Sequence, residues 1–264
     1  MQQAQDFLEE SDTLAALLDS LASSDWDRAT QFKNWTINDV LVHLYFWNRA
    51  ADQALVAPDR FQLMMGTVMA EMAGGGLRPI ENRMIPERGR DLFVVWQAQY
   101  RDMAARWGEI DPKTRVKWVG PEMSVRSSIT ARQMETWAHG MEVFDIMGRT
   151  RTDADRIANV VMLGVNTFGW SHKVQELDVP DQMPFLRLTA PSGAVWEYGE
   201  ASDVERIEGP AVAFAQVVTQ TRNVADTALR IAGPVAERWM QTAQCFAGGK
   251  ETPPAPGTRF VAAG

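Results

Sequence analysis

The chain has 264 residues, 45% of them hydrophobic, which is enough for one large domain or two modest ones with buried cores. Its formal net charge of -8 at pH 7 leaves no broad basic surface that could hold nucleic acid. The single cysteine, Cys245, excludes an internal disulfide and is typical of a reducing cytosol, so we expect a cytoplasmic protein.

The first residues show no basic segment followed by an apolar run, so we predict no signal peptide. No apolar stretch approaches the roughly 18–20 residues that a membrane-spanning helix needs. We therefore expect neither nucleic acid nor a membrane as a partner, and we leave a homodimer open.

Hydrophobic periodicity predicts a first helix over residues 2–22. A second helix is predicted to begin at Thr36, with Asp39 three residues later completing a capping pattern, and to end near Pro58. His43 lies on this second helix, and its neighbours at helical spacing are mainly apolar. We therefore expect the His43 side chain to point inward.

The next stretch alternates helices and breaks. A Met-rich helical segment is expected over residues 59–73, and the glycines of 74–76 should end it. We expect residues 79–89 to form a loop, residues 90–107 a third long helix, and residues 112–129 a second loop. The second loop leads into the helix that organises the chain.

That helix is predicted to start at Thr130, with Gln133 as the capping partner, and to stop at a left-handed Gly148. Within it, Glu135 and His139 are four residues apart, so their side chains share one face about one turn apart. A carboxylate and an imidazole in this arrangement can bind one metal ion. The alternative is an exposed pair or a hydrogen-bonded core histidine.

The chain has three histidines, His43, His139 and His172. A histidine from one helix and a Glu-x-x-x-His pair from another form a three-ligand set of the kind that helical bundles build in their cores. We therefore predict that His43, Glu135 and His139 bind a metal. His172 follows a predicted helix in a polar context, so we expect it at the surface, with a fourth ligand or a proton shuttle as the alternative.

After Gly148 we predict a helix capped by Thr152 and Asp155 that runs to about Gly169, and then a linker over residues 178–184. Beyond the linker the hydrophobic period changes, which indicates an α+β module. Its expected strands are 185–190, 194–198, 204–208 and 227–231, and its expected helices are 209–222 and 234–246.

Two motifs resemble the metal-binding N-terminal domain of mycothiol-dependent maleylpyruvate isomerases, within the wider DinB-like group. They are Trp35-Thr-Ile-Asn-Asp-Val-Leu-Val-His-Leu44 and Met134-Glu-Thr-Trp-Ala-His-Gly140, and the second marks a subgroup without an assigned substrate. The resemblance implies an α+β protein with a DinB-like four-to-five-helix bundle at 1–177. It also implies a smaller sterol-carrier-like α+β module at 185–252, followed by a tail at 253–264.

A two-histidine, one-carboxylate set leaves a metal position open, as catalytic zinc sites do, and nickel or iron would also suit it. In the related isomerases a low-molecular-weight thiol uses that position. The resemblance therefore implies a metal- and thiol-dependent isomerase or S-transferase that acts on a small, anionic substrate. A metal-dependent hydrolase and a non-catalytic metal- or ligand-binding protein are the alternatives.

Two arginines are candidate catalytic residues, because a planar guanidinium suits bidentate binding of a carboxylate. Arg126 precedes the ligand helix, with a surface ion pair as the alternative. Arg222 resembles an arginine at the end of the matching helix in the related isomerases, with a local pair to Asp226 as the alternative. We also expect Asp39 or a backbone carbonyl to accept the second ring N–H of a ligand histidine.

Overall fold

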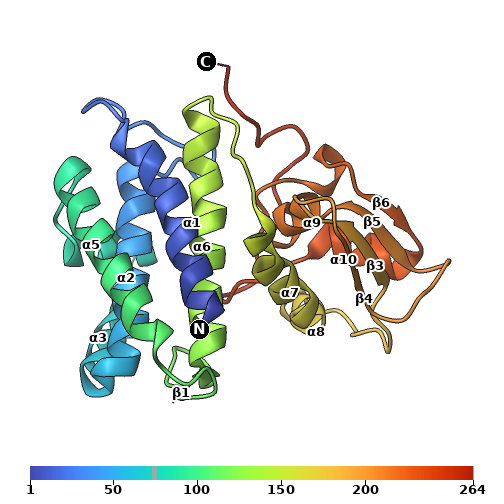
Figure 1. The fold of residues 1–264 in the computed structure, drawn as a ribbon, viewed down its shortest axis with the longest axis horizontal. Helices are drawn as coiled ribbons and strands as arrows, with labels where there is room; N and C mark the ends of the chain where they lie inside the picture. Colours follow the sequence, from blue (N-terminus) through green and yellow to red (C-terminus); the bar gives the residue numbers. More distant parts are fainter. Residues whose placement is uncertain (73–75, 264) are drawn as a thin grey trace. The chain divides into compact units, whose positions relative to one another are not determined.

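The computed structural model describes residues 1–72 and 76–263 (Figure 1). The chain divides into two compact units, Met1–Ile146 and Met147–Gly264. The first unit is helical, apart from one short pair of strands, and the second combines helices with a four-stranded sheet. The predicted α+β class, with a helical N-terminal part and an α+β C-terminal part, is confirmed.

The first unit is a bundle in which the long helix α1 packs against α5 and α6, and α2 packs against the same two helices. Shorter helices α3 and α4 pack against α2 and against each other. Aromatic side chains fill the centre, and Trp96, Trp107 and Trp137 are completely buried. The helices are α1 (Gln2–Asp19), α2 (Ile37–Val56), α3 (Pro58–Met72), α4 (Leu77–Met84), α5 (Gly89–Gly108) and α6 (Val125–Ile146).

The start of α2 confirms the predicted capping box. The Thr36 hydroxyl accepts the Asp39 N–H at 3.1 Å, and the Asp39 carboxylate accepts the Thr36 N–H at 2.9 Å. Because each group satisfies a backbone donor that the helix leaves free, the first turn is fixed. The packing of the apolar face of α2 against α5 and α6 then sets the direction in which His43 points.

Helix α4 replaces part of the loop predicted over residues 79–89. Pro79, the first residue of that expected loop, lies in the first turn of α4, where a backbone N–H has no acceptor within the helix. The α4 residues Ile80 and Glu81 are buried. The predicted break at 74–76 falls mostly on residues 73–75, which lie outside the described residues.

Helix α6 begins at Val125, five residues before the predicted start at Thr130. The hydroxyl of Ser124 accepts the Ser127 N–H at 3.1 Å, so Ser124 provides the capping contact that we assigned to Thr130. The preceding segment forms two short antiparallel strands, β1 (Arg115–Val116) and β2 (Met123–Ser124). The helix ends at Ile146, and Gly148 has a φ of 64°, as predicted for a left-handed stop.

The second unit carries a sheet with the strand order β4-β3-β5-β6. Strand β3 is antiparallel to β4 and parallel to β5, and β5 is antiparallel to β6. Helix α9 (Ala211–Val218) packs against β3 and β5, and α10 (Pro234–Thr242) packs against β6. The strands are β3 (Phe185–Thr189), β4 (Val195–Tyr198), β5 (Arg206–Pro210) and β6 (Arg230–Ala232).

The boundary between the units differs from the expected one at residue 177. Helix α7 (Ala158–Asn166) packs against α9, and a Cβ added at Gly164 would lie 2.9 Å from one ring atom of Phe214 and 2.9 Å from a methyl group of Val218. A contact this close assigns α7 to the second unit. The predicted Thr152 cap is also replaced: a short 3-10 turn (Asp155–Ile157) precedes α7, and the Asp155 carboxylate accepts the Ser192 N–H at 2.9 Å.

Candidate metal centre

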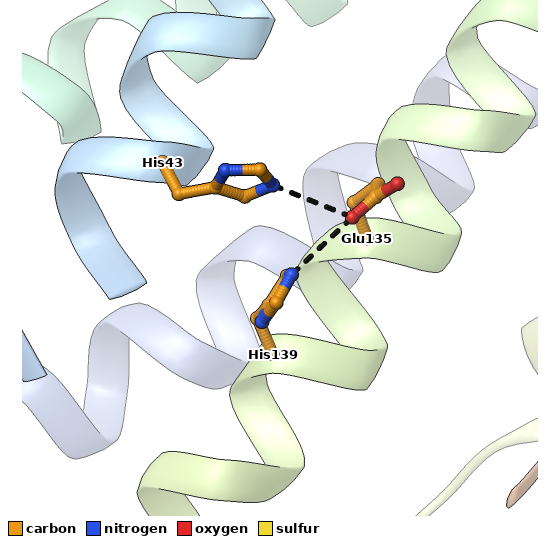
Figure 2. Close-up of side chains that lie close together, drawn as sticks. All are labelled: His43, Glu135 and His139. Carbon is orange, nitrogen blue, oxygen red and sulfur yellow. Dashed lines mark ion pairs between the residues drawn. The ribbon is translucent and has the colours of Figure 1, made fainter. Parts of the chain in front are cut away.

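His43 on α2 and the pair Glu135 and His139 on α6 point toward one another in the bundle (Figure 2). The Nε2 atoms of His43 and His139 lie 3.6 Å and 3.4 Å from the same oxygen, Oε2 of Glu135. One ligand atom from each residue lies within 4.8 Å of the other two. The structure therefore brings together the three residues that the sequence assigned to a metal.

The donor atoms and their spacing fit a divalent ion. Two ligand atoms that are each about 2.0–2.1 Å from a tetrahedral zinc lie about 3.3 Å apart. The nitrogen-to-oxygen distances of 3.4 Å and 3.6 Å are near this value, so small side-chain movements would let all three residues bind one ion and leave a further position open. Two imidazoles and a carboxylate suit zinc, and they also suit nickel or iron.

Glu81, on α4, supports one of the two histidines from behind. Its Oε1 lies 2.9 Å from Nδ1 of His43 and accepts the Nε1–H of Trp47 at 2.7 Å, and its side chain is 1% exposed. A carboxylate at Nδ1 keeps the proton on that nitrogen and leaves Nε2 directed at the site. We expected Asp39 or a backbone carbonyl in this role, and for His43 that expectation is wrong, because Glu81 occupies the position and the Asp39 carboxylate instead accepts the Thr36 N–H and the Asn82 amide.

Aromatic rings fix the orientation of both imidazoles. The Trp35 ring stacks on His139 with 5.6 Å between centroids and 4° between planes, and it meets His43 edge-on at 5.3 Å. Phe32 contacts His139 edge-on at 5.2 Å. Both histidine side chains remain 12% exposed and Glu135 20% exposed, so the first unit leaves the site accessible to a small ligand.

The charges around the cluster shift its ionisation. Burial lowers the pKa of His43, but the negative charges of Glu81 and Glu135 outweigh it and raise that pKa to about 9. Burial raises the pKa of Glu135, but hydrogen bonds from both histidines and the charge of Arg132 hold it well below its usual value. Burial also lowers the pKa of His139, and the charge on His43 adds to this effect. Without a metal, these shifts favour a protonated His43 beside an ionised Glu135 and a neutral His139.

Arg132 is the arginine that the structure places beside these ligands, and the sequence analysis missed it. It precedes Glu135 by three residues on α6, its side chain is 5% exposed, and its Nη2 lies 3.8 Å from Glu135 Oε1. Its guanidinium also lies 5.8 Å from the centre of the Trp118 ring. The spacing of three residues from Glu135 is the signal that could have identified it.

The two predicted arginines lie elsewhere. Arg126 is exposed in the first turn of α6, and nine residues separate it from Glu135. At 100° and 1.5 Å per residue, this places Arg126 on the opposite side of α6, about 13 Å along the axis. Arg222 is buried in the second unit, where its Nη1 donates to the Thr221 carbonyl at 2.8 Å. Their roles in binding stay predictions.

The expected surface position of His172 is wrong. It lies on α8 (Phe168–Val174) in the second unit, and it is 1% exposed. Its Nδ1 lies 2.9 Å from the Phe168 carbonyl oxygen, and the Phe168 ring meets the imidazole at 4.6 Å. The prediction failed because His172 has polar neighbours in sequence but lies on the buried face of α8.

Residues 7–144 match the family described as Mycothiol maleylpyruvate isomerase N-terminal domain. This match spans more than half of the chain and includes all three cluster residues, so the protein belongs to that family. Two uncharacterized proteins from different strains of Mycobacterium tuberculosis are each 31% identical to it over 243 residues, which are 92% of this chain and 94% of theirs.

Solved structures support the same fold. The crystal structure of the mycothiol-dependent maleylpyruvate isomerase matches with a TM-score of 0.54 and 13% sequence identity, over 82% of this chain and 87% of that one. A histidine mutant of that enzyme matches over the same shares with a TM-score of 0.50. Across the part of the chain that the structure describes, none of the helices has the length and apolar character needed to span a bilayer.

Proposed function

We propose that the protein is a metal- and thiol-dependent isomerase or S-transferase that acts on a small, anionic substrate. The observation that carries the proposal is the cluster of His43, Glu135 and His139, whose ligand atoms converge from two packed helices. The carboxylate behind His43 strengthens it, because metal-binding histidines usually have such a partner. Zinc is the first expectation, with nickel and iron as the alternatives.

Each residue of the site has a definite task in this proposal. When bound, a divalent ion supplies a Lewis acid that lowers the pKa of a thiol at its open position. His43, Glu135 and His139 hold three positions, and Glu81 keeps the ring of His43 in the productive tautomer. Trp35 and Phe32 fix the imidazole planes and keep water from one side of the cluster. Membership of a family described by mycothiol and maleylpyruvate isomerase supports the thiol and the isomerase chemistry.

Metal analysis provides the first test. We expect protein purified without added metal to hold a divalent ion at about one per chain, and we expect Glu135→Gln to lose most of it because a charged ligand oxygen becomes a neutral amide. Glu122→Gln, which changes an exposed carboxylate in the same unit, serves as the matched control and should keep its metal. Equal metal content in all three proteins would contradict the assignment of the ligands.

Dependence on a thiol provides the second test. Turnover of candidate unsaturated acids should require both the metal and an added low-molecular-weight thiol such as mycothiol. Turnover that depends on the metal but not on the thiol would instead indicate the hydrolase alternative. A protein that binds metal yet shows no turnover with any thiol would favour the non-catalytic alternative.

A further inference from the structure

Within the described ranges 1–72 and 76–263, no anion is hydrogen-bonded to the buried guanidinium of Arg132. Its side chain is 5% exposed, and its Nη1 atom has no hydrogen-bond partner among the residues that the structure describes. The nearest carboxylate oxygen, Oε1 of Glu135, lies 3.8 Å from Nη2, which is too long for a hydrogen bond. Burial lowers the pKa of Arg132, yet a guanidinium stays charged in proteins.

A buried guanidinium such as that of Arg132 is unfavourable unless an acceptor binds its N–H groups. Buried charged groups in proteins are usually paired and hydrogen-bonded, and an unsatisfied donor on a charged group is especially costly. The face of the Trp118 indole, 5.8 Å away, compensates for part of the charge but cannot accept the planar fork of N–H groups. The donors of Arg132 are therefore available to a ligand.

The neighbouring charges show the sign of that ligand. Glu135 and Glu81 are the two carboxylates that act on Arg132, and Glu135 turns its other oxygen toward the histidines. Once a divalent ion is bound and both imidazoles are neutral, these two carboxylates cannot balance the ion and Arg132 together. The site then carries one excess positive charge, which a singly charged anion would neutralise.

We infer that Arg132 binds the carboxylate of a small-molecule ligand beside the metal position, with two parallel N–H···O bonds from its guanidinium. This inference rests on the proposed function and deepens it, because it specifies the chemical class of the ligand and the residue that recognises it. A guanidinium suits this task because its fork matches the two carboxylate oxygens. Arg132 also lies one helical turn from Glu135, so the bound carboxylate would hold the rest of the ligand near the open metal position.

Isothermal titration of zinc-loaded protein with pyruvate, acetate and succinate tests the inference, with acetamide as the uncharged comparison. We expect millimolar or tighter binding of at least one carboxylate and no binding of acetamide. Arg132→Met should weaken carboxylate binding at least tenfold, and Arg132→Lys should weaken it less, because it keeps the charge but loses the fork. Arg90→Met, at an exposed arginine of α5, is the control and should bind as the wild type does.

The source of the carboxylate is tested separately with thiols. If the thiol carries it, mercaptoacetate should bind more tightly than 2-mercaptoethanol, and Arg132→Met should abolish the difference. If the substrate carries it, pyruvate should bind equally well to protein already saturated with 2-mercaptoethanol. Either result supports a carboxylate site at Arg132.

Two outcomes would overturn the inference: carboxylate binding that is unchanged in both Arg132 variants, or wild-type protein that binds none of the carboxylates. Metal content is measured on every sample, so a failure of the metal site is recognised separately, and the titrations are then repeated on metal-free protein. Arg132→Gln provides a second neutral variant if Arg132→Met unfolds, which the melting temperature would show.

Discussion

Glu81 is a residue whose role follows from two hydrogen bonds to one oxygen atom. It is buried, and its Oε1 receives both the Nδ1–H of His43 and the Nε1–H of Trp47. It therefore fixes the tautomer of a histidine that we propose as a metal ligand, and it is not itself one of the three proposed ligands. Partners of this kind typically contribute a factor of 10–100 to metal affinity.

We predict that Glu81→Leu lowers zinc affinity by roughly 10- to 100-fold, because His43 then loses the carboxylate that holds the proton on its Nδ1 atom. Glu81→Gln should lower it less, since the amide oxygen can still accept both N–H groups although the charge is lost. Competition with a chromophoric chelator measures both affinities. Glu71→Gln, at a more exposed carboxylate of α3, is the control, and the prediction fails if Glu81→Leu binds zinc as tightly as this control.

Among individual residues, those with helical spacing or a family motif could be predicted from sequence. His43, Glu135 and His139 were found this way, because a period of 3.6 residues fixes which side chains share a face. Glu81 could not be found, because only the packing of α4 against α2 brings it to His43. The spacing of three residues from Glu135 could have drawn attention to Arg132, but the burial of its guanidinium depends on how the helices pack and could not be predicted.

At the scale of elements, the ends of helices decided which predictions succeeded. The cap of α2 follows from two residues that are close in sequence, and it was predicted correctly. The start of α6 was placed five residues too late, because Thr130 and Ser124 both suit a cap and only the packing of Val125 and Ile129 into the core distinguishes them. The sequence thus identifies the residues that can cap a helix, and the burial of the neighbouring side chains decides which of them does so.

The cap of α2 should make stability depend on pH. Burial raises the pKa of Asp39, but hydrogen bonds from Asn82 and Thr36 and the charge of Arg78 outweigh it and leave the pKa below its usual value. A carboxyl group with a lower pKa in the folded state stabilises the fold above its unfolded pKa, near 3.9, and this stabilisation disappears as the pH falls through the folded pKa.

We therefore predict that Asp39→Ala lowers the free energy of unfolding by about 1 kcal/mol at pH 7, the usual effect of losing a cap. The difference in free energy of unfolding between the wild type and the variant should shrink below about pH 4, because protonation removes the charge of the wild-type Asp39 carboxyl group. Urea denaturation across this pH range measures it. Asp102→Ala, at an exposed position on α5, is the control and should change stability by less than about 0.5 kcal/mol. If the effect of Asp39→Ala is the same at every pH, protonation of Asp39 does not control stability.

At the scale of the whole molecule, the sequence predicted two parts of the correct classes but misplaced the boundary between them. The period of hydrophobic residues distinguishes helices from strands, and it identified the sheet of the second unit. It cannot show which helices pack together. Helix α7 looked like a continuation of the bundle, and only its close contact with α9 at Gly164 assigns it to the second unit.

The contribution of the second unit to function can be tested through Arg222, which stays a candidate for binding a substrate carboxylate. If it does so, Arg222→Lys should lower kcat/KM at least tenfold, because the fork geometry is lost, while metal content is unchanged. Arg230→Lys, at an exposed position on β6, provides the control. Wild-type kinetics for Arg222→Lys would remove this residue from the reaction.

The hydrogen bond between Glu81 and His43 also couples metal binding at His43 to the folding of helix α4. Helix α4 is only eight residues long, so it depends on its contacts with α2 and α3 to stay folded. A metal that holds the His43 ring in place should therefore protect α4 against local opening, and by the same coupling free energy a folded α4 favours metal binding. Amide hydrogen exchange in α4 should slow when zinc is added, and it should not respond to zinc in Glu81→Leu.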